Sequence, residues 1–125
     1  MNNKRVLRDI GLSNQEADAY LTLVKLGESS AANLAREMGI KRTSVYAILQ
    51  SLSSHGFAEQ LIHKKKSSYI PAKPEKLANR FEEKLQMFRD IIPSLETMEK
   101  KEARSFGLRL IETSEELKTF YRDIL

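Results

Sequence analysis

The side chains best suited to molecular recognition lie in one stretch near the middle of the 125-residue chain. They are basic, hydroxyl or amide groups, namely Lys41, Arg42, Thr43, Ser44, Tyr46 and Gln50. Such groups attract phosphates and form hydrogen bonds with the edges of bases, and no long acidic side chain stands among them. The chemistry that they predict is non-covalent binding of a polyanion.

A second basic cluster, Lys64 to Lys66, lies between two segments of strand length, residues 58–62 and 68–71. These segments predict a β-hairpin with a tip at residues 63–67, and a lysine-rich tip suits phosphate contact without base readout. The alternative is a solvated turn whose charges prevent edge-to-edge pairing of strands. Because the cluster closely follows the first stretch, phosphate contact by Lys64, Lys65 and Lys66 is the favoured interpretation.

No constellation for catalysis or for a metal accompanies these residues. The chain has no cysteine, and neither His55 nor His63 sits in a metal-ligand motif. The pairs Glu82-Glu83 and Glu115-Glu116 fall where solvation and capping of a first helical turn explain them. Because a nucleophile with a base and a glycine-rich phosphate loop are also missing, we expect no enzyme, no metal and no cofactor.

The elements that must position the recognition residues are helices. A helix over residues 42–55 is predicted by an apolar face at helical spacing, formed by Val45, Ile48, Leu49 and Leu52. By itself this pattern also suits an ordinary amphipathic surface helix. A shorter helix from Ser30, ended by Gly39, is predicted by Ala31, Leu34, Ala35 and Met38. Two helices separated by so short a turn have the spacing of a helix-turn-helix.

Upstream, Ser13 and Glu16 have the spacing of a capping box, which predicts another helix that Gly27 ends. Its predicted buried stripe is Ala17, Tyr20, Leu21 and Val24. A brief helix over residues 4–10 comes first. Together with the hairpin, these elements predict a winged helix-turn-helix domain over residues 1–74, in a protein that is mainly α with one small β-hairpin.

After Pro74 the pattern becomes that of one long helix over residues 75–103. Its apolar residues alternate spacings of three and four, the periodicity of a coiled-coil seam, and they are Ala78, Phe81, Leu85, Phe88, Ile92 and Leu95. The seam could pack on the chain's own winged helix, but a stripe with two phenylalanines favours a homodimer. Pro93 is expected to kink or break this helix, with Ser94 able to begin its continuation.

Residues 104–125 form a predicted strand and helix tail. Residues 104–107 separate the long helix from an alternating segment at 108–111, and Thr113 with Glu116 has the spacing of a second capping box. One strand and one helix cannot form a domain. The tail is therefore expected to pack on the rest of the chain or to be the start of a truncated effector domain.

Charge is distributed unevenly along the chain. Residues 1–74 hold 11 Lys and Arg against 6 Asp and Glu, a net of +5, whereas residues 75–125 hold 10 against 11, a net of −1. This asymmetry points to a polyanion as the partner of the N-terminal part. Neither a membrane span nor the apolar core of a secretory signal is present, so we expect a cytoplasmic protein without a membrane partner.

Two runs of residues resemble the N-terminal domain of TrmB-type transcriptional regulators. The first is Gly-Leu-Ser-x-x-Glu-Ala at 11–17, with Tyr20 and Leu21. The second and more specific run extends from Gly39 to Gly56 and contains Arg42, Thr43, Val45, Tyr46, Leu49 and Leu52. The resemblance covers residues 7–74 and extends more loosely along the long helix.

The resemblance implies a winged-helix DNA-binding domain, a dimer joined through the helix after the wing, and regulation of transcription. It places Arg42, Thr43, Ser44 and Tyr46 at the start of the recognition helix and Lys64 to Lys66 in the wing. Members of the family usually continue into a C-terminal effector domain that is often sugar-binding, whereas this chain stops where that domain would begin. Sugar sensing is therefore not carried over, and the chain is either a short regulator or a fragment, with any effector unknown.

The favoured function is that of a dimeric regulator that reads the major groove of double-stranded DNA with helix 42–55. Lys41, Arg42 and the wing are predicted to bind phosphates. The predicted readers of base edges are Thr43, Ser44, Tyr46 and Gln50, of which Gln50 suits a bidentate contact to adenine. The alternative is a winged-helix docking module for another protein, without specific DNA binding, although the basic wing argues against it.

Overall fold

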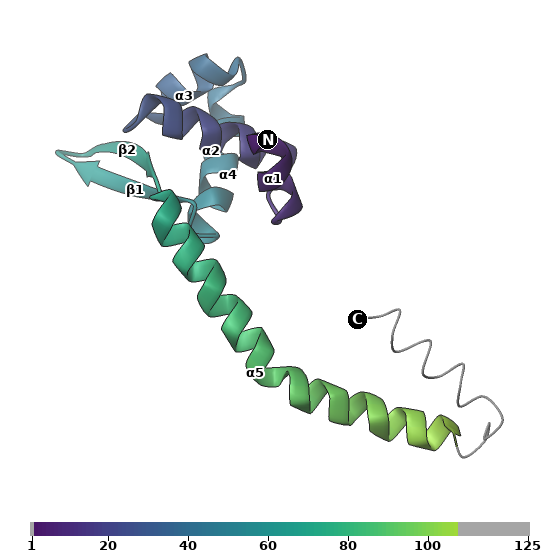
Figure 1. Cartoon of the computed structure of the whole chain (residues 1–125). Helices are drawn as coiled ribbons and strands as arrows, with labels where there is room; N and C mark the ends of the chain where they lie inside the picture. The colour runs from purple at the N-terminus through teal and green to yellow at the C-terminus, as the bar shows by residue number, and fades with distance from the viewer. Residues whose placement is uncertain (1, 108–125) are drawn as a thin grey trace. The chain divides into compact units, whose positions relative to one another are not determined.

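The computed structural model describes the backbone of residues 2–107 and the side chains of residues 2–100. Its elements, drawn in Figure 1, are α1 (Asn3–Asp9), α2 (Asn14–Leu26), α3 (Ala31–Met38), α4 (Arg42–Ser54), β1 (Ala58–His63), β2 (Lys66–Pro71) and α5 (Pro74–Gly107). Contacts divide the chain into two units, Met1–Arg80 and Phe81–Leu125. The predicted helical fold with one hairpin is confirmed, while the strand and helix predicted in 108–125 lie outside the described residues.

Short polar side chains begin the helices of the first unit where the sequence predicts. The Ser13 hydroxyl accepts from the N–H of Glu16 at 3.1 Å, and the Glu16 carboxylate accepts from the N–H of Ser13 at 2.9 Å, so the capping box forms. The Ser30 hydroxyl caps α3 by accepting from the N–H of Asn33 at 3.1 Å. Gly39, with a φ of 67°, ends α3 and leads the chain into α4.

The apolar face of α4 lies in the core of the first unit. All four residues predicted for this face are buried, and Leu49 and Leu52 have no exposed surface. They pack with α2 and α3, which contribute the fully buried Leu23 and Leu34. Burial of one such side chain stabilises the fold by roughly 1.5–3 kcal/mol. The core therefore fixes which face of α4 is left for a partner.

The stripe predicted for α2 is only partly correct. Ala17 and Tyr20 are buried, but Leu21 is half-buried and Val24 is 47% exposed. Leu23, which does not belong to the predicted stripe, is fully buried instead. The reason is that α2 packs against α1, α3, α4 and β2, so its buried surface is set by neighbours on several sides.

The hairpin tip is tighter than the predicted loop of residues 63–67. The antiparallel ladder of β1 and β2 extends to the pair His63 and Lys66, which leaves only Lys64 and Lys65 in the turn. Both lysines have positive φ, 49° and 65°, as a two-residue turn of type I′ requires. Side chains with a Cβ are disfavoured there, so strand register imposes this turn against the local preference of its residues.

A backbone bridge fixes the hairpin to the loop between α2 and α3. The N–H of Ser29 donates to the Tyr69 carbonyl at 3.0 Å, and the N–H of Tyr69 donates to the Ser29 carbonyl at 2.8 Å. Next to this bridge, the Ser68 hydroxyl donates to the Glu28 carboxylate at 2.8 Å. The hairpin is therefore fixed, through β2, to the loop between α2 and α3.

The first turns of α5 belong to the first unit. Pro74 begins the helix, where its fixed φ suits the helix and its missing N–H is not needed. Leu77 is buried, and the Arg80 guanidinium donates to the Gly56 carbonyl at 2.7 Å. The Tyr20 hydroxyl donates to the carbonyl of Ala72 at 3.1 Å, just before α5 begins. These contacts fix the first turns of α5 to the first unit.

Two predictions about the rest of α5 are wrong. The helix runs without interruption from Pro74 to Gly107, so Pro93 does not break it and Ser94 does not begin a second helix. The predicted kink is not contradicted, because Figure 1 shows α5 bending near its middle. Proline removes one intrahelical hydrogen bond, and the turns on either side carry the helix past it. Residues 104–107, predicted to separate the helix from a strand, form its last turn. Within residues 2–107, none of the helices has the length and apolar character needed to cross a bilayer.

Candidate nucleic-acid interface

The N-terminal part of α4 presents polar and basic side chains to solvent. All the recognition residues predicted on this helix and at its N-cap are exposed, namely Lys41, Arg42, Thr43, Ser44, Tyr46 and Gln50. Lys41 is the N-cap but forms no side-chain capping bond, and the first turn has no acidic residue. The backbone N–H groups of this positive helix end are therefore available to an anion.

Arg42 and Tyr46, one turn apart on α4, contact each other. The Arg42 Nη2 donates to the Tyr46 hydroxyl at 3.1 Å, and the Arg42 Cζ lies 5.7 Å from the centroid of the Tyr46 ring. Tyr46 nevertheless remains 44% exposed. In the part of the chain whose side chains are described, no carboxylate forms an ion pair with Arg42. The guanidinium is thus oriented by a neutral partner and keeps its charge unneutralised.

The C-terminal part of α4 is held by a carboxylate from α2. The Glu16 Oε2 accepts from the Ser51 hydroxyl at 2.9 Å and lies 3.4 Å from the His55 Nδ1. The Glu16 side chain is only 12% exposed. Burial acts to raise the pKa of Glu16, but hydrogen bonds from Ser13 and Ser51 and the charge of His55 outweigh it, so this pKa is lowered.

The second role of Glu16 cannot be recognised from local sequence. Its bond to Ser13 follows from capping-box spacing, whereas Ser51 is 35 residues away along the chain. His55 is the C-cap residue of α4 and also faces this carboxylate. The cluster of Glu16, Ser51 and His55 therefore joins the start of α2 to the end of α4.

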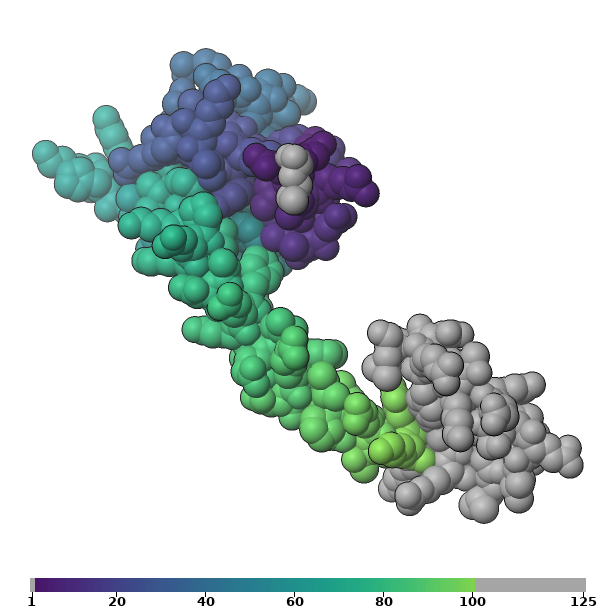
Figure 2. Space-filling model, viewed as in Figure 1, coloured from purple at the N-terminus to yellow at the C-terminus, as the bar shows by residue number. Residues whose placement is uncertain are grey.

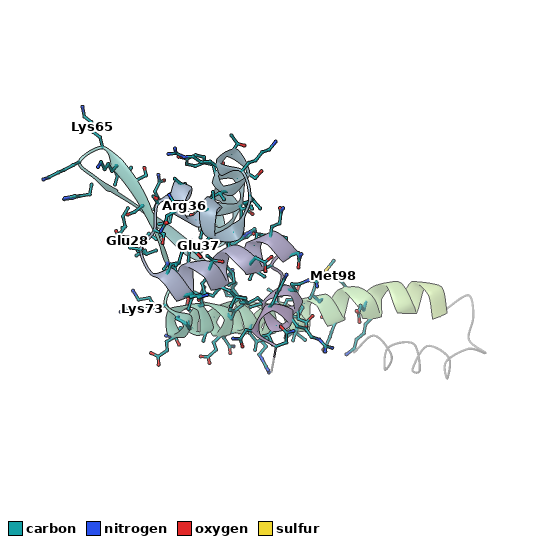
Figure 3. All side chains as sticks on the ribbon, turned by 90° about the horizontal axis from the view of Figure 1, so that it is seen from above. Glu28, Arg36, Glu37, Lys65, Lys73 and Met98 are labelled. Carbon is teal, nitrogen blue, oxygen red and sulfur yellow. The ribbon has the colours of Figure 1, made fainter. Side chains whose placement is uncertain are left out.

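The three lysines of the hairpin tip are exposed. Figure 2 shows the tip projecting from the rest of the first unit, and Figure 3 shows the Lys65 side chain pointing away from the strands. Among the side chains of residues 2–100, none pairs ionically with Lys64, Lys65 or Lys66. Their charge is therefore available to a phosphate.

Helix α4 and the hairpin are neighbours in the first unit. α4 packs against β1. Burial raises the pKa of Tyr69 in β2, and the Tyr46 hydroxyl raises it further. The two basic clusters therefore belong to elements that pack against each other within one unit.

The second predicted surface is the apolar face of α5. The predicted seam residues are all exposed or half-buried, and they are Ala78, Phe81, Leu85, Phe88, Ile92 and Leu95. Leu85 and Phe88 are 50% and 55% exposed. Met87, Ile91 and Met98 are also exposed but lie outside the seam, and Met98 is labelled in Figure 3. An apolar face of this extent is typical of a site covered by a partner.

The helix-turn-helix of α3 and α4, followed by a hairpin, defines a winged-helix domain of the DNA-binding kind. The family model for the sugar-specific transcriptional regulator TrmB matches residues 7–75. The chain is also 36% identical over 94 residues to the HTH-type sugar sensing transcriptional regulator TrmBL1 of Pyrococcus furiosus, a match that covers 75% of this chain and 26% of TrmBL1. The chain therefore belongs to the TrmB family.

Solved structures with the same architecture include TrmBL2, described as an archaeal chromatin protein with a novel mode of DNA binding. It has a TM-score of 0.72 and 27% identity, with 90% of this chain and 44% of TrmBL2 covered. A MarR family protein from Bacillus stearothermophilus, with a TM-score of 0.52 and 16% identity over 93% of this chain and 82% of its own, shows the fold alone. This chain thus spans about a quarter of TrmBL1 and under half of TrmBL2.

Membership of the family confirms several predictions from the sequence. The resemblance to TrmB-type regulators is correct, and the chain has the winged-helix domain of a family of transcriptional regulators, not of enzymes.

Proposed function

We propose that the chain is a cytoplasmic, sequence-specific DNA-binding regulator that acts as a homodimer. One observation carries the proposal: α4 buries its whole apolar face and presents an acid-free polar face next to a hairpin that ends in three lysines. The names of TrmBL1 and TrmBL2 associate these relatives with transcription regulation and DNA binding. Sugar sensing, part of the name of TrmBL1, is not extended to this chain.

In this proposal, α4 enters the major groove while the hairpin tip follows a phosphate strand. Lys41, Lys64, Lys65 and Lys66 neutralise phosphates and supply affinity that is independent of sequence. Thr43, Ser44, Tyr46 and Gln50 face the base edges, and the exposed amide of Gln50 suits a bidentate contact to N6 and N7 of adenine. Arg42 is not assigned to either set of residues, because a guanidinium can bind a phosphate or a base edge.

The proposed dimer forms through the long helix. We assign residues 1–74 to the winged-helix domain and residues 75–103 to dimerisation, because Leu85, Phe88 and Leu95 of the seam are exposed in the single chain. The exposed Leu85, Phe88 and Leu95 recur at heptad spacing, so a second copy presents a matching stripe. A two-fold dimer would place its recognition helices in half-sites about 34–36 Å apart, or a multiple of this distance.

Selection of duplexes from a randomised pool tests the proposal, followed by titration of the selected duplex with salt. The expected result is a two-fold-symmetric site whose log affinity falls with log salt by about 0.9 for each phosphate neutralised. If no sequence is enriched and binding is weak even at low salt, the winged helix is a docking module for another protein and the proposal fails.

Two variants test the division between base and phosphate contacts. Gln50→Ala is expected to relax the preference at one base pair in each half-site. Lys65→Ala is expected to weaken binding to all duplexes alike and to lower the salt slope by about 1 per chain. Equal losses on selected and scrambled duplexes for both variants would contradict this division.

A further inference from the structure

Arg42 is held differently from the other basic residues of the proposed interface. Its guanidinium donates to the Tyr46 hydroxyl at 3.1 Å and lies near the ring, with 5.7 Å between Cζ and the ring centroid. Lys41 and the lysines of the hairpin tip, by contrast, form neither ion pairs nor side-chain hydrogen bonds with any described side chain. The fold therefore orients one cation and leaves the others free to rotate.

Phosphate contact does not require such orientation. A flexible ammonium group meets a phosphate as a point charge, and several approach directions are equivalent. Reading guanine is more demanding, because O6 and N7 accept two hydrogen bonds from a planar fork in one orientation. A guanidinium held against an aromatic ring loses less rotamer freedom when it forms such a pair.

The contact with Tyr46 leaves the guanidinium able to bind a base. Arginine carries five N–H donors, and the hydrogen bond to Tyr46 uses one of them. Arg42 is the first residue of α4 and is exposed. The N-terminal residues of a recognition helix are those that contact base edges in helix-turn-helix complexes. The neighbouring Thr43 and Ser44 are short, so they do not hold the helix away from the groove.

We propose that Arg42 reads a guanine in each half-site and that Tyr46 is the positioning residue that orients its guanidinium. This inference rests on the proposed function, because it requires α4 to enter the major groove. It changes the role of Arg42 from the phosphate contact predicted by the sequence to a base contact. Tyr46, which the sequence predicted to contact base edges, instead orients the Arg42 side chain that contacts the base.

The test is to repeat the pool selection with the wild-type chain, Arg42→Lys and Arg36→Lys. Lysine keeps the charge at position 42 but lacks the planar fork. The wild-type chain is expected to enrich a guanine at one position of each half-site, and Arg42→Lys to lower that preference about 10- to 100-fold. Affinity for scrambled duplexes should change by less than about 2-fold, since the charge is kept. Arg36→Lys, at an exposed arginine of α3, should keep the guanine.

Two variants of Tyr46 test the positioning role. Tyr46→Phe removes the hydrogen bond and keeps the ring, whereas Tyr46→Leu removes both. The preference for guanine should weaken in steps from wild type to Tyr46→Phe to Tyr46→Leu, at the same base position that Arg42→Lys affects. Because both side chains are exposed, the melting temperature should stay unchanged, which excludes misfolding as the cause.

An unchanged guanine preference in Arg42→Lys overturns the inference. Loss of binding to all sequences alike also overturns it, because that is the behaviour of a phosphate contact. If the wild-type chain enriches no sequence at all, the proposed function itself fails. If the wild-type chain enriches a symmetric site in which no preference for guanine depends on Arg42, the proposed function stands and only this inference fails.

Discussion

α4 and α5 are both amphipathic helices, but their apolar faces have different environments. The four apolar residues of α4 are at most 7% exposed, whereas Leu85, Phe88 and Leu95 of α5 are between 38% and 55% exposed. Helical periodicity predicts that a face will be covered but does not identify what covers it. Other helices of the same chain bury the apolar face of α4. We propose that a second copy of the chain buries the apolar face of α5.

The largest effect is expected from Leu49→Ala in the core face of α4. Leu49 has no exposed surface, so its truncation should lower the free energy of unfolding by about 3–5 kcal/mol. Urea unfolding at fixed protein concentration measures this loss. Thr43→Ala, at an exposed position of the same helix, is the control and should stay within about 0.5 kcal/mol of wild type. Similar losses for both variants would mean that α4 is not held by its apolar face.

A smaller effect on a different quantity is expected from Phe88→Ala in α5. Phe88 is 55% exposed in the single chain, so truncation should barely change the folding of the first unit. It should instead raise the dissociation constant of the dimer by about 10-fold or more, since buried aromatic area is lost at the seam. Sedimentation over a concentration series measures this constant. Met87→Ala, exposed but outside the seam, should leave it unchanged, and equal effects of the two variants would exclude the predicted seam.

The next effect concerns the carboxylate that joins α2 to α4. The pKa of Glu16 is lowered in the folded state, so its contribution to stability is complete above its ordinary pKa of 4.5 and is lost as the pH falls through the lower folded-state value. Glu16→Gln should lower the free energy of unfolding at neutral pH by about 1–2 kcal/mol. It should also reduce the acid-induced loss of stability.

A matched control for Glu16 is the other paired carboxylate of α2. Asp18 lies 3.0 Å from the Lys4 ammonium, and its side chain is 45% exposed. Asp18→Asn should therefore cost no more than about 0.5 kcal/mol in urea unfolding, because exposed ion pairs contribute little. A larger loss for Asp18→Asn than for Glu16→Gln would contradict the role given to Glu16 in holding α4.

The smallest effect is expected at the hairpin turn. Lys65→Gly removes the cost of a positive φ at 65°, so the melting temperature should rise by an amount that corresponds to about 0.5 kcal/mol. Binding to every duplex should weaken at the same time, because a phosphate contact is lost. Lys66→Gly, within β2, should instead lower the melting temperature. Destabilisation by Lys65→Gly would show that the turn carries no such cost.

Local features of the fold were predictable from the sequence. The capping box of Ser13 and Glu16, the buried face of α4 and the end of α3 at Gly39 each depend on residues within one or two helical turns. The recognition residues on α4 are exposed as predicted for the same reason, because burying one face of a helix leaves the opposite face outside. The family could also be recognised from the sequence around α4, between Gly39 and Gly56.

Features that depend on tertiary contacts were not predictable. Leu23 is buried because four elements surround α2, and Leu77 because α5 begins against the first unit. The pairing of Arg80 with Gly56 joins residues 24 positions apart, with no local pattern to indicate it. The continuation of α5 through Pro93 shows that a single proline does not outweigh helix-forming neighbours on both sides.

The most direct test of a dimer that reads DNA through α4 is the number of chains bound to the selected duplex. Sedimentation of the complex at several ratios of protein to duplex measures it. Two chains should bind together, and Phe88→Ala should make the two binding events separate and weaker. Saturation of the selected duplex by a single chain, with the affinity unchanged in Phe88→Ala, would contradict pairing through α5.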